Sequence, residues 1–175
     1  MPGSPAHLLA RFFDVLTARG LSARERVQVS HWLEPVLAAV FFSQPRADQR
    51  HGHHAATVVA ASGRADSDAL VAALVHDVGK RHARLGVVGR SIASIMIITR
   101  LPLGRRFRSY RDHGALAARE LCRLGAPTLA VDFALHHHGR RPATIDEATW
   151  DLLVAADRAP KPSTMPWRRI TSTGK

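Results

Sequence analysis

Three groups of histidine and aspartate residues, far apart in the chain, carry side chains that bind divalent metal ions. Three histidines lie at positions 51–54, His76 directly precedes Asp77, and three consecutive histidines occupy positions 136–138. Neutral imidazole nitrogens and carboxylate oxygens together form binding sites for divalent metals. Because helix-forming segments separate the groups, a fold that brings them together would create a metal site.

His76 and Asp77 begin the clearest of these groups. They are followed by Val78, Gly79 and Lys80. The glycine lets the backbone turn sharply, and the lysine places an ammonium beside the carboxylate, where a phosphate oxygen could bind. The preceding segment, ALVAALV, is apolar on every side, which predicts a helix in the centre of the protein. The polar residues would therefore lie at the end of a buried helix.

The string HDVGK at 76–80, with its apolar lead-in, resembles the centre of the HD-domain phosphohydrolase superfamily. That family has the ligand pattern H…HD…D, and its central motif commonly reads HDxGK. The resemblance covers about 48–157. It implies an all-α helical bundle that hydrolyses phosphate esters with divalent metal ions.

The resemblance also implies the first and last ligands of the pattern. The family's first histidine lies near the start of an earlier helix, and we favour His51 over His54, with His53 third. The closing aspartate matches Asp157, which follows four apolar or small residues. A metal ion would compensate the burial of this carboxylate, and the alternative is an ion pair with Arg158 or another arginine.

Two weaker matches imply a second ion. The string around His113 resembles a His-x-x-Gly-Ala region that supplies an extra ligand, although the intervening pair is missing here. His136 and His137 resemble the family's Ile-x-x-His-His. Because consecutive helical residues do not share a face, at most two of the three histidines at 136–138 should reach the site. Asp77 would then bridge two ions; alternatively, these histidines bind phosphate or orient water without a second ion.

The reaction implied is attack of a metal-activated water on a phosphate ester, carried by one or two ions of Mn, Fe, Co, Ni, Mg or Zn per chain. Asp77, Lys80 and His113 are the expected catalytic residues, and Lys80, Arg81 and Arg84 the expected phosphate ligands. His113 or one of the three consecutive histidines would protonate the leaving oxygen.

Composition and charge bear on the substrate and on rival functions. The chain has 175 residues, a net charge of +11 and one cysteine, so its core needs no internal disulfide. Residues 80–123 carry +9, which indicates either an anionic substrate such as a nucleotide or a solvated basic surface. Two alternatives to the hydrolase are an HD-type di-iron oxygenase and a basic HD module without catalytic activity, which would bind nucleic acid or have a regulatory role. Nucleic acid is therefore a possible but not favoured partner, and the oligomeric state is left open.

One all-α domain should position these residues. We expect N-terminal helices over 1–44 packing on a core of 45–159, and a flexible basic tail over 160–175. No apolar run approaches the length of a membrane span and no signal peptide is evident, so we expect a cytoplasmic protein. The first two expected helices begin near Pro5 and at Ser22, and Pro35 should kink or interrupt the second. The next helices are expected over 45–62 and over the apolar body 69–75, with Asp66 or Ser67 as its cap. Later helices are expected over 91–100, 111–124, 127–138 and 147–158, where the stretch 94–98 also fits a buried strand.

Overall fold

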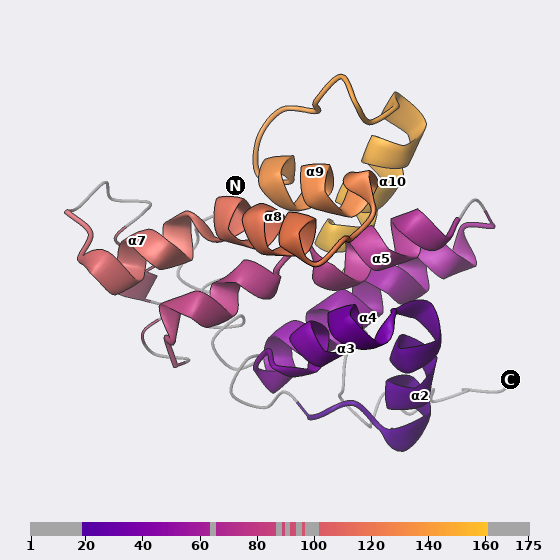
Figure 1. Cartoon of the computed structure of the whole chain (residues 1–175), viewed down its shortest axis with the longest axis horizontal. Coiled ribbons are helices and arrows are strands. Elements are labelled where there is room, and N and C mark those ends of the chain that lie inside the picture. Colours follow the sequence, from indigo (N-terminus) through magenta and orange to yellow (C-terminus); the bar gives the residue numbers. More distant parts are fainter. Residues whose placement is uncertain are drawn as a thin grey trace, which may run out of the picture.

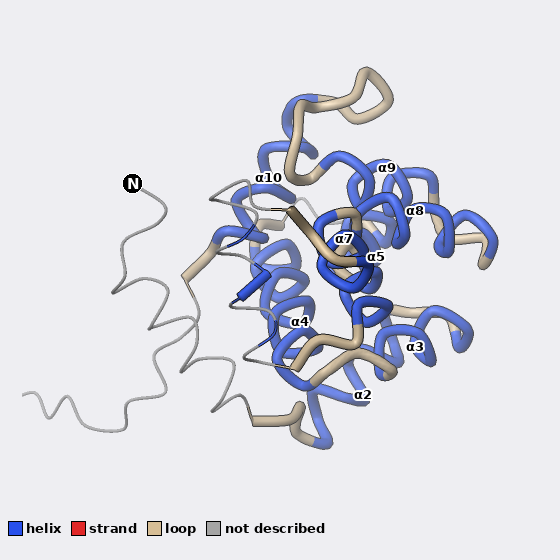
Figure 2. The backbone as a smooth tube through the Cα atoms, turned by 90° about the vertical axis from the view of Figure 1, so that its left-hand side faces the viewer, coloured by secondary structure: helices blue, strands red, loops and turns tan. Residues whose placement is uncertain are grey.

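The computed structural model of the chain describes residues 19–63, 66–86, 89, 92–93, 96 and 102–160. All regular structure in these residues is helical, which confirms the predicted all-α single domain (Figure 2). The elements are α2 (Ala23–Trp32), α3 (Pro35–Phe42), α4 (Arg46–Ala61), α5 (Ser67–Val75), the 3-10 helix η1 (Val78–Ala83), α7 (Arg105–Arg111), α8 (His113–Arg123), α9 (Thr128–His136) and α10 (Glu147–Arg158).

Three predicted segments lie outside this described part of the chain. They are the helix that begins near Pro5, most of the helix over 91–100, and the tail beyond Pro160.

Short capping signals determine where several helices begin. The Ser22 hydroxyl accepts a hydrogen bond from the backbone N–H of Glu25, and the Glu25 carboxylate accepts one from the Ser22 N–H at 2.6 Å. This is a capping box. Asp66 and Asp146 cap α5 and α10 by accepting the backbone N–H three residues later, at 2.7 and 2.9 Å. Pro35 occupies the first turn of α3. The preceding helix, α2, ends at Trp32, so the predicted interruption at Pro35 is confirmed.

The apolar helix α5 lies in the middle of the bundle. It contacts α2, α3, α4, α9 and α10, and in Figure 1 it lies between α9 and α10 on one side and α3 and α4 on the other. Its residues Ala72, Leu74 and Val75 are almost completely buried. Val29 of α2 and Phe41 of α3 belong to the same hydrophobic core, so the described part of the N-terminal segment packs on it.

Two local features differ from the sequence-based expectation. The sharp turn expected at Gly79 is part of a 3-10 helix, η1, and the predicted helix 111–124 is preceded by a separate short helix, α7. The break between α7 and α8 falls at Asp112, whose φ of −93° and ψ of 19° depart from α-helical values. None of the described helices is long and apolar enough to span a membrane.

Candidate metal centre

Five elements meet at Asp77, the residue that follows the buried end of α5. His51 comes from α4, His76 from the end of α5, and Asp157 from α10. His113 is the first residue of α8, and two histidines come from the end of α9. Asp77 is 3% exposed, and its φ of −99° and ψ of 4° lie in a sparsely populated region that active-site residues often adopt.

One oxygen of Asp77 faces the group that we call the first lobe: His51, His76, Asp77 Oδ2 and Asp157. The Nε2 atoms of His51 and His76 lie 3.7 and 3.6 Å from Asp77 Oδ2. The same nitrogens lie 2.9 and 3.2 Å from Asp157 Oδ1. Ligand atoms of His51, His76 and Asp77 lie within 4.8 Å of one another, and Asp157 adjoins this group through its contacts with the two imidazoles.

The other oxygen of Asp77 faces the second lobe: Asp77 Oδ1, His113, His137 and His138. Nε2 of His113 lies 3.2 Å from Asp77 Oδ1, and Nε2 of His137 lies 3.5 Å from it. His138 Nε2 lies 3.3 Å from His113 Nε2. One ligand atom from each of the four residues lies within 4.8 Å of all the others. Asp77 is thus shared between two groups of possible ligands.

Hydrogen bonds to the backbone determine which imidazole nitrogen faces the lobes. Nδ1 of His76 contacts the carbonyl of Ala73 at 2.9 Å, and Nδ1 of His137 contacts that of Ala134 at 2.9 Å. His113 Nδ1 makes the same contact with the carbonyl three residues earlier, at 2.7 Å. These carbonyls lie in the last turns of their helices, where a carbonyl oxygen has no hydrogen-bond donor within the helix. Because a carbonyl can only accept, each Nδ1 donates, and in the neutral ring Nε2 carries the free lone pair.

The resulting arrangement of lone pairs fits bound cations. Nε2 of His76, Oδ1 of Asp77 and Nε2 of His137 are buried atoms without a hydrogen-bond partner. A neutral Nε2 and a carboxylate oxygen are both acceptors, so their close approach is unfavourable until a cation lies between them. Divalent ions ligated by imidazole and carboxylate satisfy all three atoms. The residues present therefore fit the metal ions that the sequence implies.

The electrostatics of Asp77 are consistent with this. Burial alone would raise the pKa of Asp77, but Lys80 and His76 hold it well below its usual value. Burial lowers the pKa of His76, yet the charges of Asp77 and Asp157 outweigh it and raise that pKa overall. The carboxylates of the site thus attract positive charge to His76 Nε2, as either a proton or a metal ion.

Lys80 lies beside the shared carboxylate because of the 3-10 geometry of η1. In a 3-10 helix residues three apart align, so Lys80 returns over Asp77. Its ammonium forms an ion pair with Asp77 Oδ2, and its side chain is only 14% exposed. Burial alone would lower the pKa of Lys80, but the negative charge of the Asp77 carboxylate outweighs this effect and raises that pKa overall. The lysine therefore stays charged.

Some candidate residues lie elsewhere. Among the described residues, His53 contacts Gln28 at 2.9 Å and stacks near Trp32, and neither it nor His54 belongs to a lobe. His136, which the resemblance implied, is outside both lobes as well. His138 takes that place, because α9 ends at His136 and the following turn brings two consecutive residues to the same side.

The two expected phosphate-binding arginines are also not gathered at the shared carboxylate. Arg81 pairs with Glu120 of α8 and donates to the Val78 carbonyl at 3.1 Å. Arg84 is exposed and ends η1 with a positive φ of 48°. Lys80 is therefore the cation of this set that contacts Asp77.

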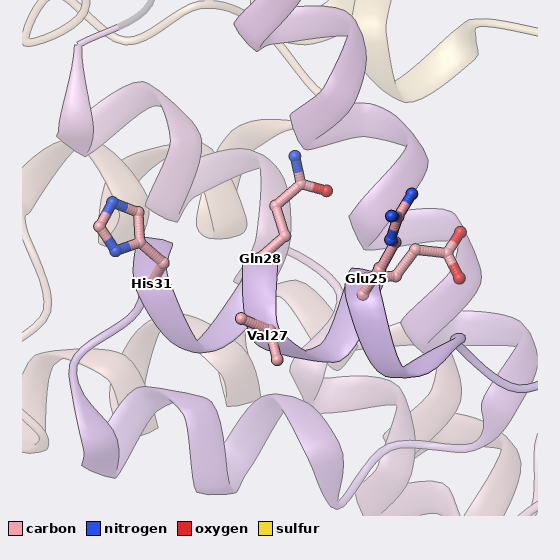
Figure 3. A pocket seen from close by; sticks show the side chains of 5 residues that line it. Glu25, Val27, Gln28 and His31 are labelled. Atoms are coloured by element: carbon pink, nitrogen blue, oxygen red, sulfur yellow. The ribbon is translucent and has the colours of Figure 1, made fainter.

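A separate hollow of about 450 Å³ lies on α2 (Figure 3). It is open to the outside and is lined by Arg24, Glu25, Val27, Gln28 and His31. None of these residues belongs to either lobe. The hollow is therefore distinct from the metal centre.

Comparison of the chain with known protein families, with curated proteins and with solved structures finds no match. The His/Asp cluster itself is compatible with metal binding.

Proposed function

We propose that the chain is a metal-dependent phosphohydrolase of the HD-domain type, which hydrolyses a nucleotide or another small phosphate ester. The observation that carries the proposal is the sharing of Asp77: its two oxygens face two separate groups of imidazoles. Divalent ions held in such a pair of sites activate water and neutralise phosphate oxygens. The HDVGK string supports the same class of reaction.

The residues of the chain would divide the work by position. His51, His76 and Asp157 would bind the ion of the first lobe, and His113, His137 and His138 would bind the ion of the second. Asp77 lies between the two lobes and offers one carboxylate oxygen to each. Lys80 stays charged beside Asp77, where its ammonium can bind a phosphate oxygen of the substrate.

The lowered pKa of His138 suits a metal ligand better than a proton donor. Burial and the neighbouring His137, His113 and Lys80 lower the pKa of His138 to about 4. Its imidazole is therefore neutral at pH 7 and offers a lone pair instead of a proton. His113 donates its Nδ1 proton to a backbone carbonyl, which leaves Nε2 as the nitrogen that faces the second lobe.

The test is a turnover assay of the purified chain with each divalent ion and three kinds of substrate: a phosphate monoester, a phosphodiester and a panel of nucleotides. We expect metal-dependent release of phosphate or of a nucleotide. Asp77→Asn should remove it while circular dichroism shows unchanged helix content. Asp151→Asn is a matched control, because Asp151 is an exposed aspartate of α10.

Two outcomes would contradict the proposal. Turnover that is unchanged in Asp77→Asn would exclude a reaction at the shared carboxylate. Two bound irons with oxygen consumption and no hydrolysis would assign the site to oxygen chemistry.

A further inference from the structure

We propose that the two lobes select different metals: the second lobe is a four-coordinate zinc site, and the first lobe takes a harder ion such as Mn²⁺ or Mg²⁺. This inference rests on the metal-binding part of the proposed function and concerns the chemistry of each lobe. It does not depend on which phosphate ester is the substrate.

The donor atoms of the lobes differ in kind. In the second lobe, three imidazole nitrogens and one carboxylate oxygen lie within 4.8 Å of one another. In the first lobe, two imidazole nitrogens and one oxygen of Asp77 do so, and a second carboxylate, Asp157, contacts both imidazoles. Imidazole suits zinc and its neighbours, and carboxylate oxygen suits Mg²⁺ and Mn²⁺. The extra imidazole and the missing second carboxylate therefore favour zinc in the second lobe.

Three of the six separations between donors of the second lobe are close to those around a tetrahedral ion, and all six are below 4.8 Å. Four donors about 2.0–2.1 Å from a tetrahedral zinc lie about 3.3–3.4 Å from one another. Asp77 Oδ1 lies 3.2 Å from His113 Nε2 and 3.5 Å from His137 Nε2. His138 Nε2 lies 3.3 Å from His113 Nε2. In the first lobe the corresponding separations spread from 2.9 to 3.7 Å, without a single preferred value.

Backbone hydrogen bonds prepare the second lobe in advance. His113 and His137 are both held through Nδ1 by helix-end carbonyls, at 2.7 and 2.9 Å. Their side chains are 6% and 2% exposed, and His137 Nε2 and Asp77 Oδ1 are buried without a hydrogen-bond partner. Such outer contacts orient imidazoles and raise their basicity. His138 is only partly buried, and as the most exposed of the four residues it completes the set on the solvent side.

The experiment uses the whole chain, stripped of metal and then equilibrated with buffered Zn²⁺ or Mn²⁺, with bound metal counted by elemental analysis. We expect one zinc ion per chain to bind at least about tenfold more tightly than the second, a difference of about 1.4 kcal/mol. Mn²⁺ should then fill the remaining lobe. Co²⁺ in the tight site should give the intense visible absorption of a tetrahedral ion.

Variants assign the tight zinc to its lobe. His138→Ala should weaken the tight zinc by at least the roughly 10- to 100-fold that outer-contact substitutions cost, and leave Mn²⁺ binding unchanged. Asp157→Asn should do the reverse. His31→Ala is the matched control, because His31 lies on the exposed face of α2 (Figure 3). If His138→Ala loses helix content, His138→Gln replaces it.

Two zinc ions of equal affinity, or a tight zinc that survives both His138 variants, would overturn the inference. These readouts do not require turnover. A tightly bound zinc in the second lobe without any hydrolysis would contradict the proposed function but support the inference about metal selection. Hydrolysis with two equivalent ions would support the proposed function but contradict the inference.

Discussion

Gly114 of α8 lies directly against the carbonyl oxygen of Ala134 in α9. A Cβ atom at Gly114 would be 2.7 Å from that oxygen, which is too close for any side chain. The same oxygen accepts the hydrogen bond from Nδ1 of His137. The absence of a side chain at Gly114 therefore keeps in place the carbonyl that orients a ligand of the second lobe.

Gly114→Ala should displace the Ala134 carbonyl and with it His137. We expect the second lobe to lose its ion, or to bind it at least about tenfold more weakly, while the first lobe keeps its own. The measurement is the number of bound metal ions per chain, beside a thermal unfolding curve.

The control and the converse variant are also glycines. A Cβ at Gly86 would meet nothing within 4 Å, so Gly86→Ala should leave both ions bound. A Cβ at Gly52 would lie 2.6 Å from the carbonyl oxygen of Leu74, two residues before His76, so Gly52→Ala should disturb the first lobe instead. Loss of the same ion in both close-contact variants would show that the glycines do not act locally.

The elements were largely predictable because their signals are local. The Ser22–Glu25 capping box, the Asp146 cap and the apolar body of α5 each depend on a few adjacent residues. η1 was missed, because a 3-10 turn after a buried helix depends on how Gly79 meets α8. A Cβ there would clash with the His113 carbonyl and lie 2.8 Å from the Ala117 nitrogen.

The candidate site was predictable in its residue types but not in every position. The family resemblance implied His51, His76, Asp77 and Asp157, and the structure brings these residues together. The choice among the three consecutive histidines was not accessible, because helical periodicity stops applying once α9 ends at His136. The pairing of Arg81 with Glu120 was equally hidden, since the two are 39 positions apart.

Arg81 is expected to stabilise the contact between η1 and α8 more than it binds substrate. Its guanidinium pairs with Glu120, and His82 contacts the same carboxylate at 2.9 Å. Arg81→Ala and Glu120→Ala should each lower the free energy of unfolding, with a coupling energy of about 0.5–1 kcal/mol in a double-mutant cycle. Urea unfolding of the two single variants and the double variant measures it. Strictly additive effects, together with a raised KM in Arg81→Ala alone, would instead support a substrate role.

Glu25 should contribute stability that depends on pH. Burial alone would raise the pKa of Glu25, but hydrogen bonds from Ser22 and from Arg50 lower it to about 2. Because the folded pKa is depressed, the contribution is complete above the unfolded value near 4.5 and is lost as the pH falls from there towards 2.

Glu25→Gln tests this contribution. The variant should unfold about 1 kcal/mol more easily at pH 7, and the difference from the native chain should shrink by pH 3. Glu34→Gln is the control, since Glu34 precedes α3 without making a side-chain cap hydrogen bond. A difference that stays constant between pH 7 and pH 3 would contradict the assignment.

Lys80 is expected to stabilise the metal-free protein by compensating the buried charge of Asp77. Its ammonium pairs with Asp77 Oδ2, and the pKa of Lys80 stays raised despite burial, so Lys80→Met leaves a buried carboxylate without its countercharge. The metal-free variant should therefore be destabilised by about 3 kcal/mol. Loading with metal should restore most of this loss, because the ion supplies the missing positive charge. A loss of stability that metal loading does not reduce would contradict this interpretation.

In the metal-loaded Lys80→Met variant, binding of inorganic phosphate should weaken by about tenfold or more, since a charge-assisted hydrogen bond contributes about 1.5–3 kcal/mol. Metal affinity should change less, because all ligands of both lobes remain. Lys80→Arg keeps the charge and should recover part of the phosphate affinity, although its planar head does not reproduce the point charge of an ammonium. Inhibition by phosphate and metal titration on the same preparations separate the two effects. Equal losses of phosphate and metal affinity would mean that Lys80 acts only through Asp77.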